Sequence, residues 1–420
     1  MLKLLDELHH PEKYFKILLK WGSLGLAMGL IGGLLGAVFH HALHFVTHLR
    51  QEGNWLLFLL PLGGLATVGL YQVLFRGRNR GTNEIIDAVL NGKPVNPLVA
   101  PAIFVATCIT HLFGGSAGRE GAALQIGGSV ASVFGKILRL KDNERTVLVM
   151  SGLAAVFAGL FGTPLTATLF TMEFASVGTI FSPALLPCYL AAFTASRISG
   201  LLGVHAETAI LNQVLDITLL NGARILVLAA AIGLLGVAMC FVFHQAEHLA
   251  EKKLKNRYLR IAVGGVLIVA LTLIVGDHRY NGAGMDMALL AVEGQTNWYD
   301  FLMKLLFTAI TLAAGFKGGE IVPTFCIGAT FGCLIGGLLG LDAGICGALG
   351  LVGLFCCATN SPIASLILSI EMFGSSNLYA FALVCVIAYV ISGNWGLYSS
   401  QVIRFSKARL VRKSEGNRQH

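Results

Sequence analysis

The chain has 420 residues, of which 55% are hydrophobic and only 12% are charged, and its mean hydropathy is +0.74. Soluble globular proteins carry roughly 25% charged residues, so this composition excludes a soluble enzyme, a disordered protein and a collagen-like protein. It predicts an all-α polytopic membrane protein. The formal net charge of +8 falls in short stretches between apolar blocks, which indicates membrane orientation and not a nucleic-acid partner.

Apolar blocks of two kinds follow one another along the chain. About 20 apolar residues cross the hydrocarbon core of a bilayer, and we expect the long blocks to do so. Short blocks that Gly or Pro interrupts predict half-spanning helices that meet inside the membrane, where irregular backbone must be buried or line a cavity. The long blocks are Ile17–Leu49, Trp55–Phe75, Ala223–Leu249 and Ile261–Val275, and the short ones are Gly121–Leu138, Pro164–Ala175, Phe325–Leu339 and Pro362–Phe373.

Four basic stretches lie between these blocks, at Arg76–Arg80, Lys136–Arg145, Glu251–Arg260 and Lys407–Arg418. Basic loops near the ends of membrane spans mark the cytoplasmic side. We assign the first, third and fourth stretches to that side, so both termini are expected in the cytoplasm. The first 19 residues alternate charged and apolar groups, and we expect no cleavable signal peptide there.

An internal repeat is visible in three pairs of segments that keep the same order at nearly one offset. The chain therefore reads as a single membrane domain, 1–420, built from two homologous halves at about 15–212 and 221–405. The repeat alone does not tell whether the halves run parallel or inverted. The pairs are Val38–His44 with Val242–His248, Gly114–Glu120 with Gly315–Glu320, and Gly152–Phe174 with Gly350–Met372.

The segment Gly114–Ala122, GGSAGREGA, precedes a short apolar block. Glycines let backbone N–H groups approach a ligand, and the N-terminus of the helix that follows is an anion site. Glu120 lies at that site, where an ionised carboxylate would compete with an anion and a protonated one could leave. This couples anion occupancy to a proton. The alternative is a surface pair between Glu120 and Arg119.

The second half carries the matching segment Gly315–Pro323, GFKGGEIVP, before its own short block. Again glycines lead into a helix start, and again a carboxylate, Glu320, stands there. Two converging helix N-termini predict one shared anion site. The alternative for Glu320 is a salt bridge to Lys317.

These motifs, together with Gly396-Leu397-Tyr398-Ser399 near the C-terminus, resemble the CLC family of chloride channels and anion/proton antiporters over nearly the whole chain. The resemblance implies an inverted repeat of tilted and half-spanning helices and a homodimer with one pore per subunit. It makes Glu120 the external gating residue and Tyr398 the inner gate, and implies no CBS domains after the last helix. The anion-binding residues it implies are Gly118, Arg119, Gly121, Arg80, Asn83, Ile321, Val322, Thr324 and Tyr398.

Three departures from the family pattern narrow the resemblance. Arg80 falls where chloride transporters carry a chloride-coordinating serine, with Asn83 in place of the proline of the same segment. Phe174 falls where the inner carboxylate is usual, and Glu320 replaces an apolar residue. Loss of the serine and gain of Glu320 resemble the bacterial fluoride-specific branch, the F⁻/H⁺ antiporters. For Arg80, direct anion binding and a plain cytoplasmic-loop role both remain open.

Fluoride accounts physically for these departures. A small, strongly hydrated anion needs short, strong donors, and a protonated carboxylic acid is one. Glu120 and Glu320 are therefore the expected gating and proton-transfer groups. We expect fluoride export in exchange for protons across a bacterial inner membrane, with lipid and a second subunit as partners and no cofactor. Rival functions are a chloride transporter or passive channel of the same fold, or a membrane-embedded enzyme or receptor-like scaffold.

Other candidate residues receive structural interpretations. Glu173 and Glu371 occupy equivalent short helices, so bonding to neighbouring helix backbone is favoured over proton relay. His40, His44 and His48 are spaced for a metal on one helix face, but no carboxylate cluster completes a site. His111 is expected to be an interior histidine whose hydrogen bonds are satisfied. The nine cysteines are scattered in apolar segments without CxxC spacing, which predicts buried apolar residues and not disulfides.

Overall fold

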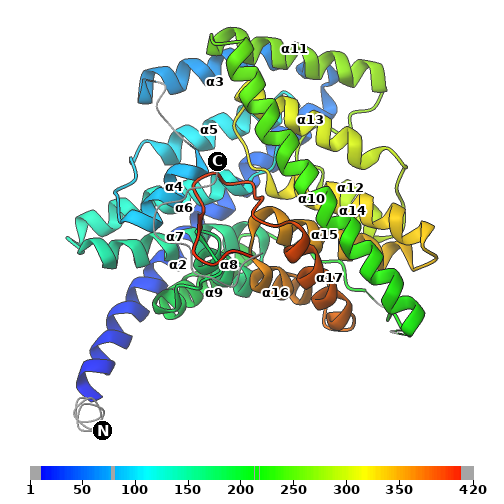
Figure 1. Ribbon diagram of the computed structural model, residues 1–420. Coiled ribbons are helices and arrows are strands. Elements are labelled where there is room, and N and C mark those ends of the chain that lie inside the picture. The colour runs from blue at the N-terminus through cyan, green and yellow to red at the C-terminus, as the bar shows by residue number, and fades with distance from the viewer. Residues whose placement is uncertain (1–10, 77–80, 212, 217, 408–420) are drawn as a thin grey trace.

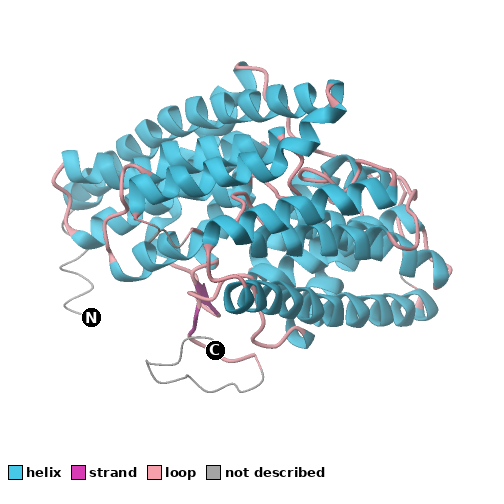
Figure 2. Ribbon diagram, turned by 90° about the horizontal axis from the view of Figure 1, so that it is seen from above, coloured by secondary structure: helices cyan, strands magenta, loops and turns pink. Residues whose placement is uncertain are grey.

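The computed structural model describes residues 11–76, 81–211, 213–216 and 218–407. Its described residues form sixteen α-helices, and Figure 2 shows helix almost throughout. The elements of the first half are α2 (Pro11–Glu52), η1 (Asn54–Leu59), α3 (Leu60–Phe75), α4 (Thr82–Asn91), α5 (Val99–Leu112), α6 (Glu120–Ile137), α7 (Asp142–Phe161), α8 (Pro164–Glu173), β1 (Ser176–Val177), η2 (Ser182–Ala184) and α9 (Leu185–Leu201). Those of the second half are α10 (Leu219–Lys253), α11 (Arg257–Val275), α12 (Met285–Val292), α13 (Asp300–Ala314), α14 (Ile321–Leu338), α15 (Ala343–Thr359), α16 (Pro362–Phe373), α17 (Leu378–Ile391) and β2 (Val402–Ile403).

Seven helical segments are long and apolar enough to cross a membrane, including those of α2, α10 and α11. Large apolar side chains also cover the outside of the molecule, with Leu219 95%, Leu201 84% and Val73 82% exposed. Water-soluble proteins rarely expose so much continuous apolar surface. The chain is therefore a multi-pass membrane protein, as the composition predicts.

Glycines let helices pack backbone to backbone at corresponding places in the two halves. In the contact of α6 with α7, a Cβ added to Gly127 would lie 2.3 Å from the carbonyl oxygen of Gly152. In the contact of α14 with α15, a Cβ on Gly328 would lie 2.4 Å from the carbonyl oxygen of Gly350. Small residues at such crossings are how membrane helices approach closely. Both helices that follow the Gly-rich loops are thereby held against a partner.

The short helices α8 and α16 begin at Pro164 and Pro362, as the sequence predicts. The helix expected over the block Phe325–Leu339 begins earlier than predicted, because α14 already begins at Ile321. Pro323 does not delay that start, since the first turn of a helix has no intrahelical N–H bond for proline to remove. The consequence is that the carboxylate of the second loop, Glu320, is the residue that immediately precedes α14.

The C-terminal segment returns from the second half to the first. β2 pairs in parallel with β1, with Ser176 opposite Val402 and Val177 opposite Ile403. Figure 1 shows this segment in red, beside the green helices α8 and α9 and in front of the centre of the molecule. The pairing fixes the position of Tyr398, four residues before β2, near the place where the two Gly-rich loops meet.

Candidate functional site

The two Gly-rich loops are joined by a pair of reciprocal backbone hydrogen bonds. The Gly118 N–H donates to the Gly319 carbonyl at 2.7 Å, and the Gly319 N–H donates to the Gly118 carbonyl at 2.8 Å. Each loop leads directly into a helix, α6 and α14 respectively. The first turns of both helices, with their unbonded N–H groups, therefore converge on one place, as the repeat predicts.

The Glu120 carboxylate lies at that place and is completely buried. Its Oε1 accepts a hydrogen bond from the Arg119 backbone N–H at 3.1 Å, and the amide of Val322 lies close enough to interact with it. Its Oε2 has no hydrogen-bond partner among the described residues. A Cβ at Gly118 or at Gly319 would lie 2.3 or 2.4 Å from Oε2. Only glycine at both positions leaves room for this side chain.

The Arg119 side chain turns away from Glu120. Its guanidinium forms an ion pair with Glu207, lies 3.3 Å from Nδ1 of His40, and covers the ring of Phe161. A surface pair between Arg119 and Glu120 is thus excluded. Glu207 belongs to the segment after α9, and the sequence pattern contains no signal that it would meet Arg119.

The second carboxylate, Glu320, is partly exposed and caps the start of α14 through its backbone. Its carbonyl accepts from the Thr324 N–H at 3.0 Å and from the Thr324 hydroxyl at 2.8 Å. The Thr324 hydroxyl is therefore engaged within its own helix. The Lys317 ammonium lies 4.7 Å from the centroid of the Tyr71 ring, and among the described residues it forms no close ion pair with Glu320.

Tyr398 is only 2% exposed, and its hydroxyl has no hydrogen-bond partner in the part of the chain that the structure describes. The edge of its ring meets Phe174, with centroids 6.3 Å apart. The charges of both Glu120 and Glu320 act on the hydroxyl. A buried hydroxyl without a partner is costly unless a ligand completes it, so this donor is available to an anion.

Most of the remaining predicted anion ligands lie in the part of the chain that the structure describes. Ile321 and Val322 form the first turn of α14 and are 1% exposed. A Cβ added to Gly121 would contact Thr82 and Gly319. Asn83 accepts a hydrogen bond from the Ser400 N–H at 3.1 Å, so it ties α4 to the segment that carries Tyr398. Arg80 lies outside the described residues.

Two cavities reach the paired loops, and we name the one of larger volume the outer cavity and the one of smaller volume the inner cavity. The outer cavity, of about 960 Å³, is lined by residues that include His40, Arg119 and Val322. The inner cavity, of about 340 Å³, is lined by Asn83, Glu320 and Tyr398 among others. Glu120 lines neither cavity, but its chain neighbour Arg119 lines the outer one and Glu320 lines the inner one, so its carboxylate lies between them. This arrangement suits a gate.

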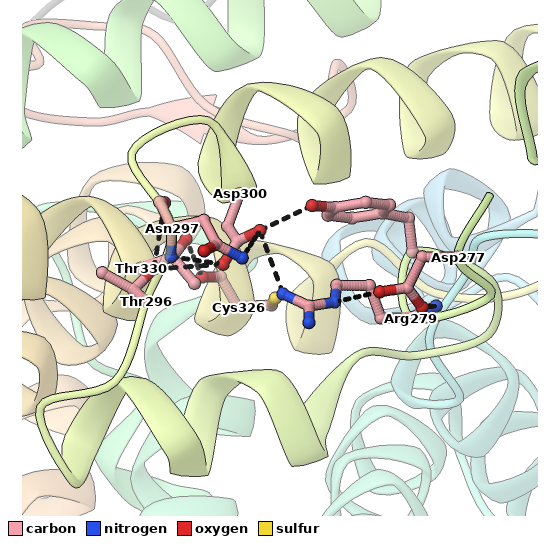
Figure 3. Close-up of polar contacts among 8 residues, drawn as sticks. Asp277, Arg279, Thr296, Asn297, Asp300, Cys326 and Thr330 are labelled. Carbon is pink, nitrogen blue, oxygen red and sulfur yellow. Dashed lines mark hydrogen bonds and ion pairs between the residues drawn. The ribbon is translucent and has the colours of Figure 1, made fainter. Parts of the chain in front are cut away.

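A dense polar network, shown in Figure 3, forms one wall of the outer cavity. Buried Asp300 accepts from the Tyr280 hydroxyl at 2.5 Å and the Asn297 N–H at 2.8 Å, and it pairs with Arg279 at 3.5 Å. Behind it, buried Lys304 donates to the carbonyl of Gly282 at 2.7 Å and to the hydroxyl of Ser116 at 3.0 Å. Lys304 thus ties this wall to the GGSAGREGA loop.

Lys304 is a residue that the sequence interpretation missed as part of the site. Its only signal is that it is a lone lysine in the apolar stretch that precedes GFKGGEIVP. A buried ammonium needs several acceptors, but the sequence gives no indication of which loops supply them.

The side chains of Glu173 and Glu371 each bind backbone amides at the start of the helix that carries the other. Glu371 accepts from the Leu165 and Thr166 N–H groups of α8 at 2.9 and 2.8 Å. Glu173 accepts from the Ile363 and Ala364 N–H groups of α16 at 3.3 and 3.0 Å. Each carboxylate satisfies orphan amides at a helix start, which is the backbone-bonding role that the sequence favoured.

The histidines and cysteines have contacts outside the paired loops. No group of three His, Cys, Asp or Glu side chains suited to a metal occurs among the described residues. His41 and His244 place ring nitrogens 2.8 and 3.3 Å from backbone carbonyls instead. His111 is buried as expected, with Nδ1 3.0 Å from the Thr107 carbonyl, but the expectation that its hydrogen bonds are satisfied is wrong, because its Nε2 has no partner in the described chain. All nine cysteines are free thiols.

Comparison with known proteins places these features in context. The family model for voltage-gated chloride channels matches residues 63–393. A chloride/fluoride channel protein of Pseudomonas syringae pv. tomato is 32% identical over 92% of this chain and 87% of its own length. A voltage-gated ClC-type chloride channel of Shigella flexneri is 27% identical over 81% and 84% of the two chains.

Solved structures with the same arrangement of helices include a CLC-type fluoride/proton antiporter. It superposes with a TM-score of 0.88 at 34% identity, covering 92% of this chain and 98% of the other. A slow cyanobacterial Cl⁻/H⁺ antiporter shares the fold, with a TM-score of 0.76 at 18% identity over 89% and 94% of the chains. These matches confirm the predicted all-α, CLC-type fold.

Proposed function

Because this chain belongs to the CLC family of voltage-gated chloride channels and antiporters, we propose that it exports fluoride in exchange for protons and thereby protects the cell from fluoride. Family membership identifies it as an anion transporter or channel and not an enzyme. The single observation that carries the exchange mechanism is the position of Glu120, buried between two cavities with an unpartnered oxygen.

The proposed cycle follows from competition for one set of donors. While ionised, Glu120 occupies the amides at the starts of α6 and α14 and blocks the route. When an anion takes those amides, the carboxylate must leave or accept a proton, since two negative charges at one buried site repel each other. Each anion that passes therefore requires a change in the protonation of Glu120. Glu320, which interacts with Glu120 electrostatically, is the proposed second proton-transfer group.

Fluoride is the proposed anion because the site offers short, strong donors. The available donors are the amides of Ile321 and Val322, the free hydroxyl of Tyr398, and the O–H groups of the two acids when protonated. Charge-assisted and O–H donors form the shortest hydrogen bonds. The similarity to a fluoride/proton antiporter over nearly the whole chain supports the same choice. Arg119 is assigned to the outer opening and not to the central site, because Glu207 holds its guanidinium.

The membrane placement is also part of the proposal. Arg257 and Arg260, from a predicted cytoplasmic stretch, line the inner cavity, which supports a cytoplasmic position for that cavity. We place the protein in a bacterial inner membrane with both termini in the cytoplasm. It is proposed to work as a homodimer with one pore in each subunit and with two homologous halves in each chain.

A second candidate is a proton-independent anion channel or chloride transporter. It is favoured by Phe174, which is fully buried against Tyr398 where the resemblance leads one to expect a carboxylate on the inner proton route. Proton movement distinguishes the two candidates, since a channel carries fluoride or chloride without it.

The test uses the full chain in proteoliposomes loaded with potassium fluoride, with a fluoride electrode and a pH probe. Exchange predicts that fluoride efflux is accompanied by proton uptake, and that Glu120→Gln abolishes the proton movement. Fluoride efflux without proton uptake in the wild type would favour the channel instead.

A further inference from the structure

The inner half of the proton route needs a group that the family resemblance does not supply. Phe174, at the expected carboxylate position, is completely buried and packs against Phe170 and Tyr398. Its ring can neither accept nor donate a proton. A proton that reaches Glu320 must therefore leave by another path.

The inner cavity offers such a path, because Phe174 is not among the residues that line it. Glu247, near the C-terminal end of α10, lines the same cavity as Glu320 and has an exposed side chain. The volume of about 340 Å³ is large enough for several water molecules, and it has polar walls that would hold them. Water in this space connects a partly buried acid to an acid at the surface.

The charges of the two acids interact across this cavity. The Glu247 and Glu320 carboxylates act on each other, and Glu320 acts in turn on Glu120. Three carboxylates thus form a series, from fully buried Glu120 through partly buried Glu320 to exposed Glu247.

Several basic side chains lie along the same cavity as Glu247 or close to it in the chain. The Lys317 ammonium, seated on the Tyr71 ring, interacts with both Glu247 and Glu320. Arg257 and Arg260 also line this cavity, and Arg260 is paired with Glu251 at 3.3 Å. His244 lies one turn before Glu247, with Nε2 3.3 Å from the Leu397 carbonyl. One cation therefore acts on both carboxylates.

We propose that Glu247 is the inner proton-relay residue of the exchanger. This inference rests on the proposed function. The Glu320 O–H bond breaks, a water chain in the inner cavity carries the proton, and an O–H bond forms on the Glu247 carboxylate. Glu247 then releases the proton to water at the cavity mouth and is again a carboxylate, while Glu320 stays ionised until Glu120 passes it the next proton. The same steps run backwards for proton movement in the other direction.

Two measurements on the full chain in proteoliposomes test the relay. The first is proton uptake that accompanies fluoride efflux. The second is exchange of [¹⁸F]fluoride across vesicles with equal fluoride and equal pH on both sides, which needs no net proton movement. Removing a positioned proton-transfer group commonly slows its step by about 10²–10⁴-fold, although cavity water can bypass part of the loss.

For Glu247→Gln we expect proton uptake to fall at least about tenfold while tracer exchange stays near the wild-type rate, which also shows a folded transporter. Glu247→Asp should recover proton uptake, because it keeps a carboxylate. Glu251→Gln is the matched control, one turn along α10, lining the same cavity but held by Arg260, and should behave as wild type.

Unchanged proton uptake in Glu247→Gln would overturn the relay, as would an equal loss in Glu251→Gln, which would indicate a general effect of surface charge. A wild-type protein that moves fluoride without protons would instead overturn the proposed exchange itself, so the two failures are distinguishable.

Discussion

Gly118 and Gly319, 201 residues apart in the chain, exchange two backbone hydrogen bonds and enclose one oxygen of Glu120 between them. Neither position can carry a side chain without displacing that oxygen. The pairing joins the two halves of the chain at one point, and it is the point where we propose that the carboxylate acts as the gate. The geometry of the gate therefore depends on both halves at once.

Gly319→Ala tests this enclosure. The new Cβ would lie 2.4 Å from Glu120 Oε2 and 2.7 Å from the Gly121 N–H nitrogen, so the carboxylate or the loop must move. We expect coupled transport to fall at least about tenfold, equivalent to a barrier change of about 1.4 kcal/mol or more. Gly69→Ala on α3, where a Cβ has open space, is the control and should retain transport. Normal coupling in Gly319→Ala would show that the enclosure does not matter.

Tyr398→Phe removes a buried hydroxyl that has no protein partner, while the ring contact with Phe174 remains. Thermal stability should therefore change little. Fluoride affinity should weaken by about 10- to 150-fold, because a hydrogen bond to a charged group contributes about 1.5–3 kcal/mol. Calorimetric titration of fluoride into the purified protein measures the affinity. A large loss of stability with unchanged affinity would contradict the assignment of this hydroxyl to the anion.

Glu173→Gln and Glu371→Gln test the helix-start contacts of α16 and α8. Each glutamine would turn an NH₂ group or a weaker acceptor toward two N–H donors, so we expect a loss of about 1–3 kcal/mol in stability for each. The ratio of protons to fluoride should stay at the wild-type value. Loss of proton coupling in Glu173→Gln, with its unfolding temperature unchanged, would instead assign that acid to the proton route.

Lys304→Met tests the link between the outer wall and the first Gly-rich loop. The change leaves the Gly282 and Tyr280 carbonyls without their ammonium donor. We expect unfolding at a clearly lower temperature, since each unsatisfied buried acceptor costs about 1–3 kcal/mol. Exposed Lys252→Met should have no such effect. Equal unfolding temperatures for the two variants would argue against the structural role of Lys304.

Several features of the site could be predicted from the sequence because they are local. Glycines followed by a carboxylate and an apolar helix specify a helix N-terminus with an acid at it, and the repeat predicts that two such termini meet. The backbone-bonding role of Glu173 and Glu371 followed from their equivalent positions in the two halves. Each of these inferences uses only neighbours in the chain or the repeat.

Other features depend on contacts that no local pattern encodes. The pairing of Arg119 with Glu207 joins residues 88 positions apart, and Lys304 reaches acceptors on two separate loops. The early start of α14 was not predicted, although proline at position 323 is compatible with the first turn of a helix. The position of Glu247 beside Glu320 follows from how α10 packs, which the sequence does not reveal.

The central claim is that this protein exchanges fluoride for protons in preference to chloride. The most direct measurement loads proteoliposomes with equal potassium fluoride and potassium chloride and follows both anions with ion-selective electrodes and the protons with a pH probe. The account predicts fluoride efflux with simultaneous proton uptake and little loss of chloride. Chloride efflux at a comparable rate, or fluoride efflux without proton uptake, would contradict it.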